Sequence, residues 1–269
     1  MQAARMTLLL SALAAIAAAA GCSPADNDAA NGAAPGAALE EQGYQLAPEL
    51  TGVAPVGPDG RIMLSGQAGP AAVVRLATPA GEAVFATADR RGAWRVAVPG
   101  AAAPRLFSLS MSDNGRIVQA MGYLFVTPDG VVARLRAGGG SEVLAAKPGM
   151  AALALDYDSR QAATMSGVAA AGEAESLRVD GVERGQATTD ASGRFVLPVS
   201  EPLSAGSHDF DLAGAKSEVR FSAAIDTPRP LASQPFAVSQ LPQGWRVDWL
   251  TPGGGEQTTL VFDALAPAT

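Results

Sequence analysis

The chain has 269 residues, of which only 17% are charged, and it carries a formal net charge of −7 with one His and one Cys. This length is enough for two domains with separate cores. The acidic balance argues against nucleic-acid binding and against charge-driven binding to anionic lipid headgroups. A single Cys excludes an internal disulfide. The 30 Gly and 19 Pro separate short apolar segments, which favours an all-β fold over a helical one.

Residues 1–21 have the pattern of a secretion signal. Arg5 provides the positive start, and residues 8–20 form an apolar run that is short for a membrane-spanning helix. The run ends at Cys22, the only cysteine of the chain. A lone Cys at this place in an exported protein needs a specific explanation.

The segment Ala19-Ala20-Gly21-Cys22 resembles the lipobox of bacterial lipoproteins. The resemblance implies that Cys22 becomes the acylated first residue of the mature chain and anchors it to a membrane. Ser23, which follows the Cys, is similar to the residues that direct such proteins to the outer membrane. Ala19 stands where the family usually has Leu. The alternative is ordinary cleavage after Ala20, which would leave Cys22 as a free thiol.

We expect five segments along the chain. After the signal peptide, residues 22–43 lack periodicity and are rich in Ala, Asn, Asp, Gly and Pro, so they are predicted to be a flexible tether. Residues 44–147 form the first β-sandwich domain and residues 148–235 the second. Residues 236–269 form a C-terminal β-hairpin, which should dock on the second domain because an isolated hairpin is only marginally stable.

The two domains are expected to be copies of one another, since matching residues recur 101 positions apart. Each copy has an Asp-x-x-Gly turn followed by a strand in which large residues alternate with others. Asn-Gly and Asp-Gly pairs between extended runs predict tight hairpins. The matching pairs are Ser65-Gly66 and Ser166-Gly167, Leu76 and Leu177, Asp89 and Asp190, Gly92 and Gly193, and Trp94 and Phe195.

These matching residues resemble the pattern of bacterial immunoglobulin-like modules, over most of residues 60–225. A similar turn and aromatic residue occur in transthyretin-like modules, so the strand connections stay open at this stage. The resemblance implies an all-β fold of two tandem immunoglobulin-like β-sandwich domains, preceded by a signal peptide and flexible linker and followed by the hairpin. It implies little about activity.

The sequence offers few candidates for chemistry. His208 is the only residue that could serve as the base of a Ser/His/Asp triad, but no nucleophile motif accompanies it, and we expect it to face solvent at the start of a strand. One His and one Cys cannot supply a usual zinc site. Several Asp residues near strand ends could supply oxygens to calcium, but such residues more commonly cap turns, so we expect no metal and no cofactor. They are Asp89, Asp156, Asp158, Asp190, Asp209 and Asp211.

We therefore expect a non-enzymatic cell-envelope lipoprotein, held at the outer membrane by a lipid anchor, with a structural or protein-interaction role. Its partner is an unidentified envelope protein or polysaccharide, not nucleic acid. One alternative is a carbohydrate- or peptidoglycan-binding module that uses Trp245 and Trp249. Their alternation with Val247 fits a buried face better. A second alternative is a hydrolase with an unrecognised site at His208.

Overall fold

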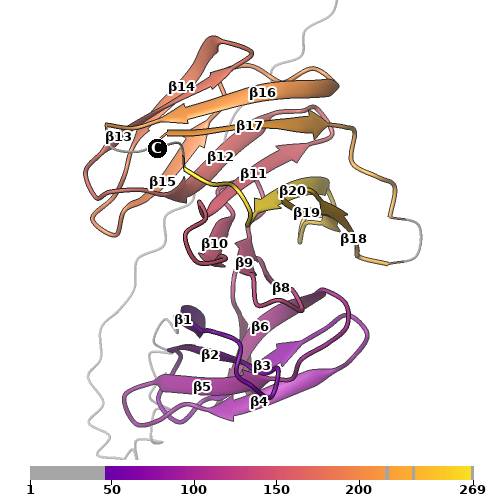
Figure 1. The fold of residues 1–269 in the computed structure, drawn as a ribbon. Coiled ribbons are helices and arrows are strands. Elements are labelled where there is room, and N and C mark those ends of the chain that lie inside the picture. Colours follow the sequence, from indigo (N-terminus) through magenta and orange to yellow (C-terminus); the bar gives the residue numbers. More distant parts are fainter. Residues whose placement is uncertain (1–45, 216–217, 232–233, 268–269) are drawn as a thin grey trace, which may run out of the picture. The chain divides into compact units, whose positions relative to one another are not determined.

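The computed structural model describes residues 46–215, 218–231 and 234–267, and it is built from antiparallel β-strands (Figure 1). These residues belong to one compact unit, Tyr44–Thr269. Within the described ranges, no helix has the length and apolar character required to cross a membrane. The predicted all-β class is confirmed.

The strands follow one another closely and are four to nine residues long. In the first half they are β1 Glu49–Ala54, β2 Ile62–Gln67, β3 Val73–Ala77, β4 Ala83–Thr87, β5 Ala93–Val98, β6 Arg105–Asp113, β7 Arg116–Gln119, β8 Tyr123–Val126, β9 Val132–Leu135 and β10 Glu142–Ala145. In the second half they are β11 Leu153–Asp158, β12 Ala163–Val168, β13 Ala174–Val179, β14 Val182–Thr188, β15 Arg194–Pro198, β16 Gly206–Ala213, β17 Glu218–Ile225, β18 Phe236–Leu241, β19 Gly244–Leu250 and β20 Glu256–Phe262.

The first sandwich pairs a sheet β1-β2-β5 with a sheet in which β3 lies between β4 and β6, and β7 pairs with β6. The inward residues of both sheets form one buried cluster that includes Leu64, Val74 and Trp94. The start of β6 also pairs with β8, which extends the second sheet through β9 to β10. The strands β8, β9 and β10 give the first sandwich an additional packing surface, which the repeat alone would not predict.

The second sandwich repeats the same strand order, with β11-β12-β15 facing β14-β13-β16-β17. Trp94 on β5 and Phe195 on β15 are each only 3% exposed. Trp94 lies opposite Gly66 on β2, and Phe195 lies opposite Gly167 on β12. The predicted tandem sandwiches and the equivalence of their aromatic residues are confirmed.

The Ser-Gly pair of each repeat has a packing reason. A Cβ atom added to Gly66 would lie 1.8 Å from the backbone carbonyl oxygen of Glu49 and 2.6 Å from the ring of Trp94. One added to Gly167 would lie 2.4 Å from Leu153 and 2.9 Å from the ring of Phe195. Any larger residue would displace the neighbouring strand or side chain as well as the aromatic ring. The glycine and the aromatic residue therefore recur together because each ring lies across the neighbouring strand.

The C-terminal segment completes a sheet of the second sandwich. The predicted hairpin corresponds to β19 and β20, and β18 precedes it. β20 lies between β11 and β19, so one sheet runs β15-β12-β11-β20-β19-β18. Its inward face, with Leu260 and Phe262, belongs to the core of the second sandwich. The segment is thus part of the sheet that it was expected to dock on.

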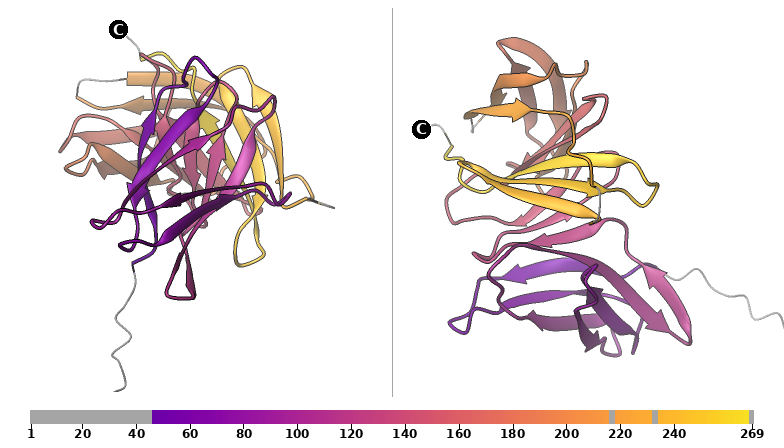
Figure 2. Two further views of the ribbon diagram at one scale, coloured as in Figure 1. Left: turned by 90° about the horizontal axis from the view of Figure 1, so that it is seen from below. Right: turned by 90° about the vertical axis from the view of Figure 1, so that its right-hand side faces the viewer.

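The outward face of this sheet packs on the β8-β9-β10 extension of the first sandwich, as the right-hand view of Figure 2 shows. The third buried cluster joins Phe125 and Leu135 to Val247, Trp249 and Val261. Successive sheets therefore bury apolar side chains on both faces. The division of the chain at residues 147 and 235 stays a prediction, since this shared core crosses both positions.

A buried polar cluster fastens the turn between β9 and β10 to the second sandwich. The carboxylate of Asp156 accepts hydrogen bonds from the backbone and hydroxyl of Ser141, both at 2.7 Å, from Thr259 at 2.6 Å and from Gln257 at 3.1 Å. Gln257 also donates to the carbonyl of Arg136 at 2.8 Å. We call this group the Asp156 cluster.

The equivalence of the two aromatic residues predicts the effect of truncating one of them. Phe195→Ala should lower the free energy of unfolding by about 3–5 kcal/mol, because it leaves a cavity in the core of the second sandwich. The control is Val182→Ala on β14, where the side chain is 55% exposed and little should change. Urea-induced unfolding measures both, and similar losses in the two variants would contradict the assigned core.

Candidate functional site

The predicted lipidation site, Cys22, lies outside the described residues, as do the signal peptide and most of the tether. Lipidation therefore stays a prediction. The described residues direct attention to a cleft that the sequence did not reveal.

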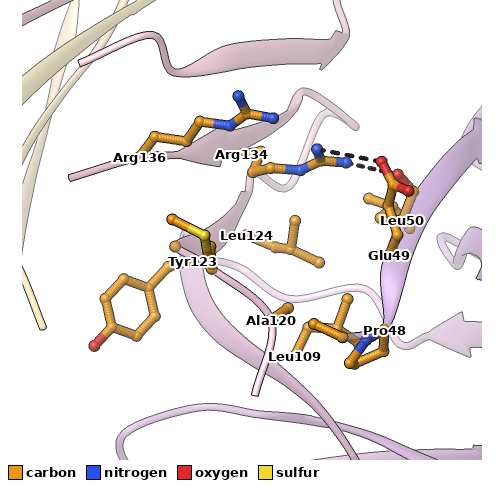
Figure 3. Close-up of a pocket in the computed structure, with 12 residues that line it drawn as sticks. Pro48, Glu49, Leu50, Leu109, Ala120, Tyr123, Leu124, Arg134 and Arg136 are labelled. Atoms are coloured by element: carbon orange, nitrogen blue, oxygen red, sulfur yellow. Dashed lines mark hydrogen bonds and ion pairs between the residues drawn. The ribbon is translucent and has the colours of Figure 1, made fainter. Parts of the chain in front are cut away.

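Two adjacent hollows border the segment that connects β7 to β8. The first has a volume of about 310 Å³ and is walled by residues of β1, β6, β8 and β9 (Figure 3). The second has a volume of about 780 Å³ and reaches the turns after β9 and β19. We call the two hollows the Met121 cleft. The residues that border both are Ala120, Met121, Gly122, Tyr123 and Arg136.

The floor of the Met121 cleft is apolar. Leu50, Leu109 and Leu124 are buried beneath it, whereas Met121 is 88% exposed. Tyr123 lies in the wall and meets Trp249 edge-on, with ring centres 5.7 Å apart. An exposed, adaptable Met beside an apolar hollow is typical of surfaces that bind other molecules.

The rim of the cleft is cationic. The carboxylate of Glu142 is shared by three guanidinium groups, from Arg136 at 2.9 Å, Arg194 at 3.2 Å and Arg134 at 3.3 Å. Arg134 also donates to the carbonyl of Leu50 at 2.6 Å and is held in place. A second carboxylate, that of Glu49 in the cleft wall, lies 3.8 Å from Arg134 (Figure 3). Three guanidinium groups against two carboxylates leave a net positive charge at this edge of an acidic chain, which favours anionic groups.

The two tryptophans of the tail contribute to the shared core. Trp249 is fully buried, and its indole nitrogen donates to the hydroxyl of Thr259 at 3.0 Å. Trp245 is half-buried and meets Phe125 edge-on, with ring centres 6.2 Å apart. The expected core position is confirmed, and the two rings do not form an exposed pair on which a sugar could stack.

His208 is buried, with 8% of its surface exposed, so the expectation that it faces solvent was wrong. Nδ1 lies 2.7 Å from the carboxylate of Asp180, and Nε2 lies 2.8 Å from the backbone carbonyl of Ser204. Both acceptors require an N–H donor, so the geometry fits an imidazolium. The ring is shielded from solvent because the turn before β14 and the loop before β16 both lie against it.

The same residues place a hydroxyl near the ring, since Oγ of Ser204 lies 3.4 Å from Nε2. A general base needs a free lone pair aimed at the hydroxyl. Here the carbonyl of Ser204 is closer to Nε2 and accepts the hydrogen bond that its N–H donates. The arrangement therefore connects the loop to the turn and does not activate Ser204 as a nucleophile in this geometry.

The strand-end Asp residues have different partners. Oδ1 of Asp89, Asp158 and Asp190 each accepts two backbone N–H groups of the following turn, at 2.7–3.1 Å. Such bonds are the usual role of Asp in turns. Asp156 lies in its own buried cluster. Among the described residues, no group of three or more His, Cys, Asp or Glu is placed to hold a metal ion.

Sequence reasoning missed the Met121 cleft because its walls come from strands far apart in the chain. The one available signal was the alternation of Arg134 and Arg136 with buried Leu135 on β9 and in the turn that follows it. That pattern indicates two charged groups on one side of a strand, but not the partner that they share.

Comparisons with known proteins add little. No protein-family model matches the chain, and no curated protein matches it at a significant level. One similar solved structure is described as "Biofilm associated protein - BSP domain", with 13% identity and a TM-score of 0.24. The match covers 68% of this chain and 30% of that one, so the chain spans less than a third of its length. A likeness at this level supports no conclusion about function.

The His208 contacts predict a pH dependence of stability. Burial alone lowers the pKa of His208, but the hydrogen bonds to Asp180 and the Ser204 carbonyl outweigh it and raise the pKa above its ordinary value. The charged ring therefore stabilises the fold in full below about pH 6.5, the unfolded pKa, and this contribution is lost as pH rises through the higher folded value.

His208→Gln should flatten the decline of unfolding free energy as pH rises above about 6.5, whereas Ser207→Ala, at an exposed neighbouring position, should keep it. Urea unfolding at a series of pH values gives both curves. If the His208→Gln curve has the same slope as the unaltered protein, the imidazolium is not bound as described.

Proposed function

We propose that the chain is a lipid-anchored, non-catalytic protein of the cell envelope that binds another envelope component through the Met121 cleft. The anchor is Cys22, as the lipobox-like segment implies. The observation that carries the binding role is the cleft, an apolar floor beside exposed Met121 with a cationic rim. Its partner is expected to offer an apolar group and a carboxylate or phosphate, which match the floor and the rim.

The position of the Met121 cleft supports a role in presenting a binding surface. The cleft lies where the β8-β9-β10 extension meets the second sandwich, and buried apolar contacts on both faces of that extension hold its walls. A rigid wall lowers the conformational cost of binding. His208, the only His of the chain, is engaged with Asp180 and Ser204, and this supports a binding role over a hydrolytic one.

The anchor and the cleft are tested separately. Cys22→Ala should move the mature protein from the membrane fraction to the soluble fraction, because several acyl chains hold a protein firmly and the variant has none. Ser23→Ala is the matched control and should stay with the membrane. Signal-cleaved Cys22→Ala protein that still sediments with membranes would refute the anchor.

For the cleft, a photo-reactive amino acid is placed at Met121 or, as the control, at Ile117 on β7, which is 73% exposed. Irradiation of intact cells should give a discrete adduct at position 121 only, and Arg136→Glu should weaken it because the rim loses a cation. Equal labelling at both positions, or no adduct at 121, contradicts binding at the cleft.

A further inference from the structure

Comparison of the two repeats shows one core position at which an apolar residue of the first sandwich is replaced by a charged residue in the second. On β3 of the first sandwich, the inward residues Val74 and Leu76 are fully buried. The positions 101 residues later are Glu175 and Leu177 on β13, and Glu175 is only 2% exposed. A carboxylate therefore occupies a core position that is apolar in the other copy.

The carboxylate of Glu175 is not balanced by its surroundings. Its Oε1 atom is buried and has no hydrogen-bond partner. A Cβ added to Gly214 would lie 2.5 Å from this oxygen, so a side chain at position 214 would clash with the carboxylate. Burial, and then the charge of nearby Glu173, raise the pKa of Glu175. A buried acceptor without a donor costs free energy and calls for an explanation.

Glu175 lines a cavity of about 350 Å³ at one end of the second sandwich, where it opens to solvent beside exposed Met150 and Val168. The walls include Leu153 and Phe195 from one sheet and Leu212 and Val219 from the other. This space follows from the repeat, because the strand pairing makes the larger Trp94 and Met111 the first-sandwich counterparts of Phe195 and Gly214. Smaller walls leave room beside the carboxylate.

We propose that this cavity binds a small organic amine, with its ammonium group at Glu175 and its apolar body between Phe195, Leu212 and Val219. An ammonium carries three donors and a positive charge, which matches a carboxylate without a donor. Glu173 is the one other carboxylate in the described lining and the remaining side chains are apolar, so a bare metal ion would lack the full set of oxygen ligands that it needs. The volume is at the lower end for ligand cavities, which fits a compact molecule. This site is separate from the Met121 cleft.

The test uses two amines, phenethylamine and hexylamine, with phenylacetate as the anionic counterpart and 2-phenylethanol as the neutral one. Isothermal titration of the purified full-length protein near neutral pH should show saturable binding of at least one amine, with phenylacetate and 2-phenylethanol at least about tenfold weaker. If neither amine binds, or if the alcohol binds as well as its amine, the proposal is overturned.

Glu175→Val places the first sandwich's residue at the equivalent position, so the variant is expected to fold with a melting temperature that is not lowered. It should weaken amine binding at least about tenfold, as should the closer variant Glu175→Gln. Glu183→Gln, at an exposed position on β14, should bind the amine like the unaltered protein. Unchanged binding in folded Glu175→Val would overturn the role of the carboxylate.

Discussion

The carboxylate of Asp156 accepts four hydrogen bonds, and the two from Ser141 hold the turn between β9 and β10 against the second sandwich. Burial raises the pKa of this carboxyl, and the bonds from Thr259, Ser141 and Gln257 oppose that shift. A buried charge is tolerated only when donors surround it. Because these donors come from both sandwiches, the cluster is complete only when the two are joined.

The apolar contacts between the sandwiches act together with this cluster. Apolar packing holds the two faces together but does not by itself specify their register. The Asp156 cluster supplies directional contacts, and Lys147 adds a second bridge, at 3.2 Å from Asp129 and 3.4 Å from buried Asp263. Gln257 of the Asp156 cluster also donates a hydrogen bond to the backbone carbonyl of Arg136, whose guanidinium group lies at the cleft rim. The cleft therefore depends on the same contacts that join the two sandwiches.

The fold was predictable where the information was local. The repeated Asp-x-x-Gly turn and the aromatic residue that follows it predicted two equivalent sandwiches, because turn chemistry and strand alternation act within a few residues. Trp249 was also expected in a core, and the contacts of β19 confirm it.

The polar partners were not predictable, because they lie far apart in the chain. Asp156 was considered only among the strand-end carboxylates, yet it meets Ser141 in one buried cluster. His208 was expected in solvent for the same reason, since neither Asp180 nor the fold of the Ser204 loop was visible as its partner. Such side-chain pairings depend on how the strands are arranged in the sheets. Amino-acid composition and residue spacing do not reveal that arrangement.

The most direct test of this account is hydrogen exchange at the Ser141 amide, which donates to Asp156. Asp156→Ala should speed exchange at this amide by about a hundredfold or more, the equivalent of about 3 kcal/mol, while Asp158→Ala on the same strand should leave it unchanged. Unchanged protection of the Ser141 amide in Asp156→Ala would show that apolar packing alone joins the sandwiches, which would contradict the account.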